Sequence, residues 1–247
     1  MASGMVLTEN VPDNHNPGMC FSGFAPYEEF ARVLLPVNDQ TKDGSHDNSH
    51  LIRVWSNARS IQAEEGGNSE ILAAAVLLHD CVYVPKNSPD RKTASSLAAQ
   101  KARTVLAELL GWERARVELV ADAIESHSFS AGIAPKSLEG RILQDADRLD
   151  AIGLIGIARC FYTAGRLGTS LYDPSDPRGD RRELRDDRFA LDHFPRKLLR
   201  LAAAFQTSTG QRLALERHAM LERFYGGFLD EIGGSHHRDV GVNPQIK

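Results

Sequence analysis

The feature that most constrains the fold is a continuous apolar run, residues 71–78, which ends in the adjacent pair His79-Asp80. Asn68, Ser69 and Glu70 precede the run, and this order of residue types is typical of a helix N-terminus. Two polar side chains that close a buried helix are costly to desolvate unless something pairs with them. The run therefore predicts a core helix with a paired His-Asp at its end. A divalent ion would be such a partner, although the pair alone also fits a polar helix C-terminus.

Two other segments offer groups of the same chemistry. His50 lies where a polar stretch with Ser and Asp meets an apolar periodic segment, which predicts the first turn of a helix, with His50 facing inward like Val54. Asp145, Asp147 and Asp150 stand in an otherwise apolar helical stretch, where solvation of all three carboxylates is hard to sustain. Imidazoles and carboxylates from separate helices predict a mixed N/O site for one divalent ion, with Mn, Mg, Fe, Co, Ni and Zn as candidates.

Five strings, in this order, resemble a known family. They are SHDNSHLIRVW (45–55), LHD (78–80), SHSFS (126–130), QDADRLDAIG (144–153) and ALDHF (190–194). Together they resemble the HD-domain superfamily of metal-dependent phosphohydrolases, and more closely its YedJ-type bacterial subgroup, from about Pro26 to about Ile232. The resemblance implies an all-α fold, an HD-domain helical bundle with a central metal site. It also implies the metal ligands His50, His79, Asp80 and Asp147.

Asp147 is preferred to its neighbours for two reasons. In the alarmone hydrolases of the superfamily, the last ligand is the aspartate of an Ala-Asp-Arg-Leu string, which is residues 146–149 here. Asp145 lies about 200° round the helix from Asp147, whereas Asp150, at i+3, shares its face. We therefore expect Asp150 to support a ligand or bind substrate, and Asp145 to face solvent or act as a cap partner.

The resemblance implies hydrolysis of a phosphate ester or anhydride in a small phosphorylated metabolite, above all a nucleotide, with release of phosphate or pyrophosphate. The ion would activate a water and withdraw charge from a phosphoryl oxygen. Asp80 is expected to orient or deprotonate that water, and His127 to donate a proton to the leaving oxygen or bind phosphate. Cationic residues after the His-Asp pair are expected to bind the substrate phosphate, unless they are only solvated surface charges: Lys86, Arg91 and Lys92.

Composition limits the function class without identifying it. The chain of 247 residues has a formal net charge of −4, which does not suggest nucleic acid as a partner. Its three cysteines have no CxxC spacing, and the chain shows neither a long apolar run nor a secretory signal, so we expect a cytoplasmic protein without a membrane partner, a monomer or a homodimer. We expect one HD domain over residues 25–235, with flexible tails over 1–24 and 236–247.

Hydrophobic periodicity and cap residues predict helices throughout this domain, and no alternating strand pattern of useful length occurs. The expected helices besides the core helix cover residues 26–35, 46–65, 88–110, 113–127, 137–163, 191–205 and 211–232.

Two alternatives come from other function classes. A non-catalytic, nucleotide-binding regulatory HD module would keep the four signature residues without turnover. A zinc protease would use His46 and His50, whose spacing approaches the HExxH motif. The protease alternative places Asp where that motif has Glu, and it leaves His79, Asp80 and Asp147 unexplained.

Overall fold

The computed structural model describes residues 20–38, 48–84, 88, 92–128 and 131–233. Within these ranges the chain is all-α, as expected, and its only β pairing is a single bridge between Ser170 and Phe189. The α-helices are α1 (Glu28–Leu34), α2 (Asn48–Glu65), α3 (Ser69–Leu78), α4 (Ala94–Leu110), α5 (Arg114–His127), α6 (Leu138–Asp150), α7 (Gly153–Leu167), α8 (His193–Arg196) and α9 (Ser208–Ile232). Short 3-10 helices are η1 (Phe21–Phe24), η2 (Leu35–Val37), η5 (Ala190–Asp192) and η6 (Leu198–Ala204).

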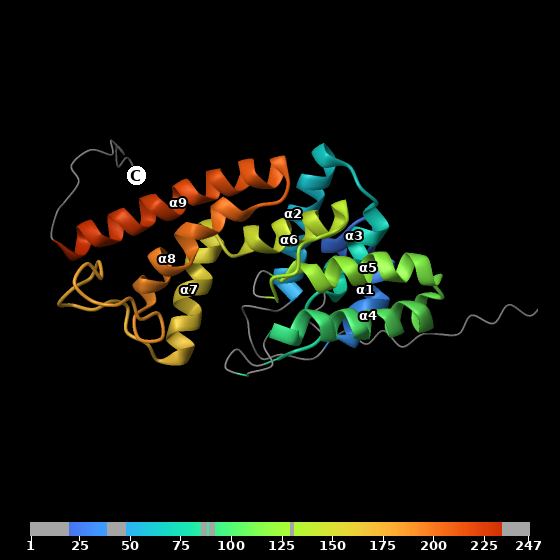
Figure 1. The fold of residues 1–247 in the computed structure, drawn as a ribbon, viewed down its shortest axis with the longest axis horizontal. Coiled ribbons are helices and arrows are strands. Elements are labelled where there is room, and N and C mark those ends of the chain that lie inside the picture. The colour runs from blue at the N-terminus through green and yellow to red at the C-terminus, as the bar shows by residue number, and fades with distance from the viewer. Residues whose placement is uncertain (1–19, 39–47, 85–87, 89–91, 129–130, 234–247) are drawn as a thin grey trace, which may run out of the picture.

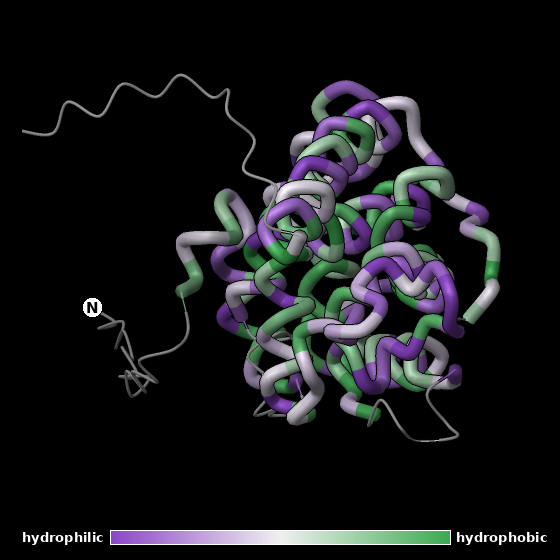
Figure 2. Tube along the Cα trace, turned by 90° about the vertical axis from the view of Figure 1, so that its left-hand side faces the viewer, coloured by the Kyte–Doolittle hydropathy of each residue, from purple (hydrophilic) through white to green (hydrophobic). Residues whose placement is uncertain are grey.

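The helices form two groups that share α6. Figure 1 shows α1–α6 on the right and α7–α9 on the left, with α6 reaching from the first group toward the second. In Figure 2 the hydrophobic residues lie mainly on the inner sides of the coils and the polar residues on the outer sides. None of the described helices is both long and apolar enough to cross a membrane.

α3 is the central helix of the first group, and it confirms the predicted core helix. Its residues from Ile71 to Leu78 are all buried, and it packs against α1, α2, α5 and α6. The Asn68 side chain accepts hydrogen bonds from the backbone N–H groups of Glu70 and Ile71, so the predicted cap is present. Complete burial of a leucine side chain contributes about 2 kcal/mol, which makes this helix a main source of stability.

The single helix expected over 137–163 is wrong, because the chain breaks between α6 and α7. Ile152 is extended, and Gly153 has φ +70°, a left-handed conformation that favours glycine. A Cβ at Gly156 would lie 2.3 Å from the carbonyl oxygen of Ala151, so only glycine allows α7 to begin so close to the end of α6.

Other helix boundaries differ less. α4 begins at Ala94 rather than residue 88, and α9 begins at Ser208 rather than 211, capped by the Thr207 side chain, which accepts from Gly210 N. The helix expected over 191–205 is instead the sequence η5, α8 and η6. Pro195 lies inside this stretch and has no N–H to donate, which disfavours one continuous helix.

Aromatic rings hold the second group of helices together. Phe161 of α7 contacts Phe194 of α8 and Phe224 and Phe228 of α9, with ring centroids 5.9 to 6.1 Å apart. Next to this cluster, buried Asp192 accepts two hydrogen bonds from the Arg182 guanidinium. His193 forms a hydrogen bond to Asp186 through Nδ1, so both Asp192 and His193, adjacent in sequence, have structural partners.

Asp145 links α6 to the start of α9. Its carboxylate is buried, not in solvent, and accepts hydrogen bonds from the backbone N–H groups of Gln206 and Thr207 and from the Thr207 hydroxyl. Burial raises the pKa of Asp145, and these hydrogen bonds offset part of that rise. The side chain therefore acts as a cap partner, on the opposite side of α6 from the metal-capable groups.

Asp145→Ala is expected to lower the free energy of unfolding by about 3 kcal/mol, because buried N–H donors would lose their acceptor. Urea denaturation followed by circular dichroism measures this loss. Metal stoichiometry should stay that of the wild-type protein, unlike that of Asp147→Ala. A larger loss of metal from Asp145→Ala than from Asp147→Ala would show that the wrong face of α6 was assigned.

Candidate metal centre

Three separate helices bring the four candidate ligands together. His50 lies in the first turn of α2, His79 and Asp80 follow the last residue of α3, and Asp147 lies near the end of α6. α2 packs against α6, and α3 packs against both, so these segments, far apart in sequence, meet inside the first group of helices. The two histidines are 1% exposed, whereas the side chains of Asp80 and Asp147 are about a third exposed. The cluster is therefore buried on its imidazole side and open on its carboxylate side.

Each histidine is oriented by a hydrogen bond at Nδ1. His79 Nδ1 lies 2.8 Å from the carbonyl oxygen of Val76, one turn back in α3, and His50 Nδ1 lies 2.8 Å from Asp150 Oδ2. Because a carbonyl and a carboxylate only accept, Nδ1 carries the proton in both rings and Nε2 presents a lone pair. Burial lowers the pKa of His50, which favours its neutral form.

The lone pairs converge on the two carboxylates. His50 Nε2 lies 3.5 Å from Asp147 Oδ1 and 3.8 Å from Asp80 Oδ2. His79 Nε2 lies 3.6 Å from Asp80 Oδ2 and 4.0 Å from Asp147 Oδ1. Ligands that share one divalent ion at about 2.1 Å each lie roughly 3 to 3.5 Å apart, so small shifts would place all four around one ion.

The chemistry of the cluster fits a cation. His79 Nε2 is buried and has no hydrogen-bond partner among the described residues. A buried polar atom without a partner costs free energy unless something binds it. Two imidazoles and two carboxylates are the donor set of borderline or hard divalent ions, so the residues present fit the expected metal.

His127 extends the cluster on the Asp80 side. It ends α5, its Nδ1 donates to the carbonyl oxygen of Ile124 at 2.6 Å, and its ring meets that of His79 edge to face at 4.9 Å. His127 Nε2 lies 3.9 Å from Asp80 Oδ1. Burial, followed by the neighbouring His79, lowers the pKa of His127, which favours a neutral ring with a lone pair at Nε2. His79, Asp80 and His127 also form a metal-capable group of their own.

Asp150 orients His50 by binding its Nδ1, the ring nitrogen that faces away from the other ligands. Besides the bond to His50, its carboxylate accepts from Arg53 Nε at 2.6 Å and from Arg159 Nη1 at 2.6 Å. Burial alone would raise the pKa of Asp150, but the bonds from His50 and Arg53 outweigh it and hold the pKa well below its ordinary value. The residue is 1% exposed, so this carboxylate orients a ligand rather than presenting an open face to substrate.

Of the three residues expected to bind phosphate, the structure describes only Lys92. Lys92 is exposed just before α4. Lys86 and Arg91 lie outside the described residues, as does His46 of the protease alternative.

The two arginines at Asp150 were missed by sequence reasoning. Arg53 could have been placed near the site from the sequence, because it lies at i+3 from His50 and shares its helix face. Arg159 could not, because on one continuous helix it would point away from Asp150.

The chain matches known proteins over most of its length. The model of the HD domain matches residues 48–152. The uncharacterized protein YpgQ of Bacillus subtilis (strain 168) is 33% identical over 197 residues, which cover 78% of this chain and 87% of that protein.

Two solved structures show similar folds. The structure of Bacillus subtilis YpgQ in complex with ADP has a TM-score of 0.63 at 31% identity, covering 84% of this chain and 100% of that one. An HD-superfamily hydrolase from Bacillus thuringiensis has a TM-score of 0.62 at 32% identity, covering 84% of this chain and 98% of that one.

Proposed function

This chain belongs to the HD-domain family, and from that premise we propose that it is a metal-dependent phosphohydrolase of a small phosphorylated metabolite, above all a nucleotide. One observation carries the proposal: the Nε2 atoms of His50 and His79 converge on the Asp80 and Asp147 carboxylates at 3.5 to 4.0 Å, at the open side of a buried cluster.

His50, His79, Asp80 and Asp147 would hold one divalent ion, with Mn, Mg, Fe, Co, Ni and Zn as candidates. When bound, such an ion supplies Lewis-acid withdrawal of charge from a phosphoryl group and activation of water. The buried histidines fix the position of the site, and the partly exposed carboxylates leave room for a phosphoryl group from solvent.

We propose that Asp80 and His127 take up the proton of the attacking water and donate a proton to the leaving oxygen. Asp80 Oδ2 faces the ligand histidines, whereas its Oδ1 faces His127 Nε2 at 3.9 Å. An attacking water held by Asp80 can therefore give its proton to Oδ1 or to the lone pair of His127 Nε2. His127, once protonated there, can donate that proton to the leaving oxygen.

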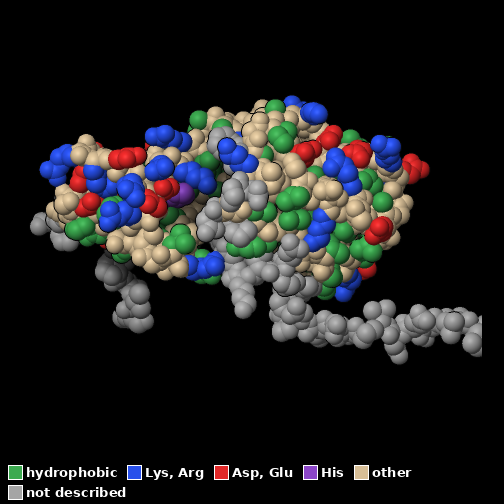
Figure 3. Space-filling view, turned by 60° about the horizontal axis from the view of Figure 1, so that its bottom comes forward, with side chains coloured by type: hydrophobic (Ala, Val, Ile, Leu, Met, Phe, Trp, Pro, Cys, Tyr) green, Lys and Arg blue, Asp and Glu red, His purple; other side chains and the backbone are tan. Residues whose placement is uncertain are grey.

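Two observations support an anionic nucleotide as substrate. Bacillus subtilis YpgQ, a relative with the same fold, was crystallised with ADP. Figure 3 shows many Lys and Arg side chains, with some Asp and Glu side chains among them, on the left-hand part of the molecule, where Figure 1 draws α7–α9 and the segment between α7 and α8. The scissile bond is that of a phosphate ester or an anhydride, and the products are phosphate or pyrophosphate accordingly.

The test is release of phosphate and of pyrophosphate from a panel of nucleoside mono-, di- and triphosphates. Chelator-stripped protein is supplied with each candidate metal in turn, and Asp147→Ala runs beside it. We expect metal-dependent release that the variant lacks, and the released product names the bond. Stoichiometric metal uptake without release from any nucleotide would contradict the proposal and favour the non-catalytic regulatory module.

A further inference from the structure

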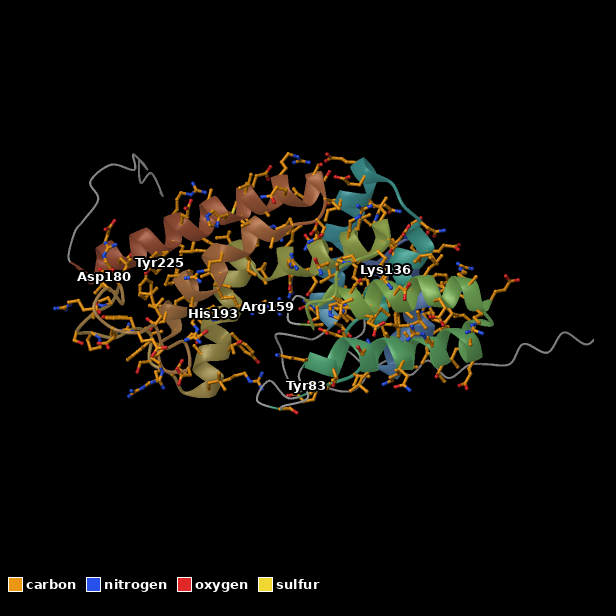
Figure 4. The ribbon with its side chains drawn as sticks, viewed as in Figure 1. Tyr83, Lys136, Arg159, Asp180, His193 and Tyr225 are labelled. Carbon is orange, nitrogen blue, oxygen red and sulfur yellow. The ribbon has the colours of Figure 1, made fainter. Side chains whose placement is uncertain are left out.

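Arg159 is held at the metal centre by one arm of its guanidinium. Its Nη1 donates to Asp150 Oδ2 at 2.6 Å and to the Asp150 carbonyl oxygen at 3.1 Å. The Nε and Nη2 groups donate to no described residue, and the side chain is 19% exposed. In Figure 4, Arg159 lies between α7 and the helices of the first group. The side chain thus keeps donors available next to the cluster of ligands.

The charges around Asp150 do not cancel. Asp150 is one anion, and it is paired with two cations, Arg53 and Arg159. A divalent ion would be balanced by the Asp80 and Asp147 carboxylates. One positive charge therefore remains beside the metal centre, and a guanidinium with two donors on one edge binds a phosphate oxygen pair well.

Exposed apolar side chains flank Arg159 along α7. Ile155 and Tyr162 lie at i−4 and i+3 from Arg159, positions that share one side of a helix, and they are 40% and 47% exposed. At the far end, the Arg166 guanidinium lies 5.8 Å from the centre of the Tyr162 ring. A cation beside the metal centre, with an exposed aromatic ring one turn further along the helix, suits a ligand that is anionic at one end and aromatic at the other.

We propose that α7 is the substrate-binding wall of the metal centre: Arg159 binds the phosphate next to the one attacked, and Tyr162, one turn further along α7, contacts the nucleobase. The inference rests on the proposed function, because it assumes a phosphorylated substrate at the metal. It names the substrate class more narrowly as a nucleotide with at least two phosphates.

The test measures binding by calorimetry to the full-length, Mn-loaded protein, with two probes that cannot be hydrolysed. The α,β-methylene analogue of ADP carries phosphates and base, and methylenediphosphonate carries phosphates alone. The variants are Arg159→Gln and Tyr162→Ala. The control is Arg217→Gln, which removes another partly buried arginine near the end of α6 that donates to the Leu149 carbonyl oxygen and to Asn57 Oδ1 rather than to the Asp150 carboxylate.

We expect Arg159→Gln to weaken both probes at least tenfold at unchanged Mn affinity. Tyr162→Ala should weaken the ADP analogue alone, and Arg217→Gln should weaken neither. Loss of Mn affinity in Arg159→Gln, in parallel with both probes, would overturn the inference and make the residue a positioning group for Asp150. Wild-type affinities in both α7 variants would overturn it as well. Failure of the wild-type protein to bind either probe would instead refute the proposed function, and the inference with it.

Discussion

Asp80→Ala is expected to lower metal-dependent phosphate or pyrophosphate release by about 1000-fold or more and to reduce metal binding strongly. The substitution deletes the carboxylate whose Oδ2 lies 3.6 Å from His79 Nε2 and whose Oδ1 lies 3.9 Å from His127 Nε2. One ligand and one proton acceptor are thus lost together, and positioned proton transfer alone contributes about 100- to 10,000-fold. Turnover assays and calorimetric metal titration measure the two losses separately.

Asp80→Asn separates the two roles, because an amide oxygen can still approach the metal but cannot take up a proton. It should retain more metal affinity than Asp80→Ala while turnover stays low. Asp122→Ala, on an exposed position of α5, is the matched control and should behave as wild type. Helical content should be unchanged in all three, since Asp80 lies after α3. Wild-type turnover and metal uptake in Asp80→Ala would refute both roles.

The core of the fold could be predicted because its signals are local. The apolar run of α3 and its Asn68 cap are neighbours in sequence, so helix type, burial and starting point follow from the same few residues. The break between α6 and α7 depends on tertiary contacts instead. Helical periodicity continues across the break. The need for glycine at positions 153 and 156 becomes visible only in the folded structure, where α7 begins next to the end of α6.

The candidate site shows the same contrast: its ligands could be predicted from the sequence, whereas an arginine beside them could not. His50, His79, Asp80 and Asp147 were chosen from residue chemistry and family resemblance, and the structure brings their ligand atoms together. Arg159 could not be chosen, because on an unbroken helix it would lie about 180° round from Asp150. The turn at residues 151–153 brings the two side chains within hydrogen-bond distance.

Asp150→Ala is expected to weaken metal binding about 10- to 100-fold, the usual cost of removing the group that orients a ligand histidine. Without the carboxylate, His50 loses the acceptor that fixes the proton on Nδ1 and the lone pair on Nε2. Arg53 and Arg159 would also face each other without their shared anion. Breaking a buried ion pair costs about 3–5 kcal/mol, and these arginines are 29% and 19% exposed, so we expect a loss of about 2 kcal/mol in unfolding free energy.

Calorimetric titration with Mn and urea denaturation of the metal-free protein measure the two effects independently. Asp150→Asn is the informative companion, because its amide oxygen can still accept from His50 Nδ1 while its charge is gone. It should recover most of the metal affinity but little of the stability, since both arginines still lack an anion. If Asp150→Ala instead binds Mn as tightly as the wild-type protein, packing alone orients His50, and Asp150 serves only to neutralise the arginines.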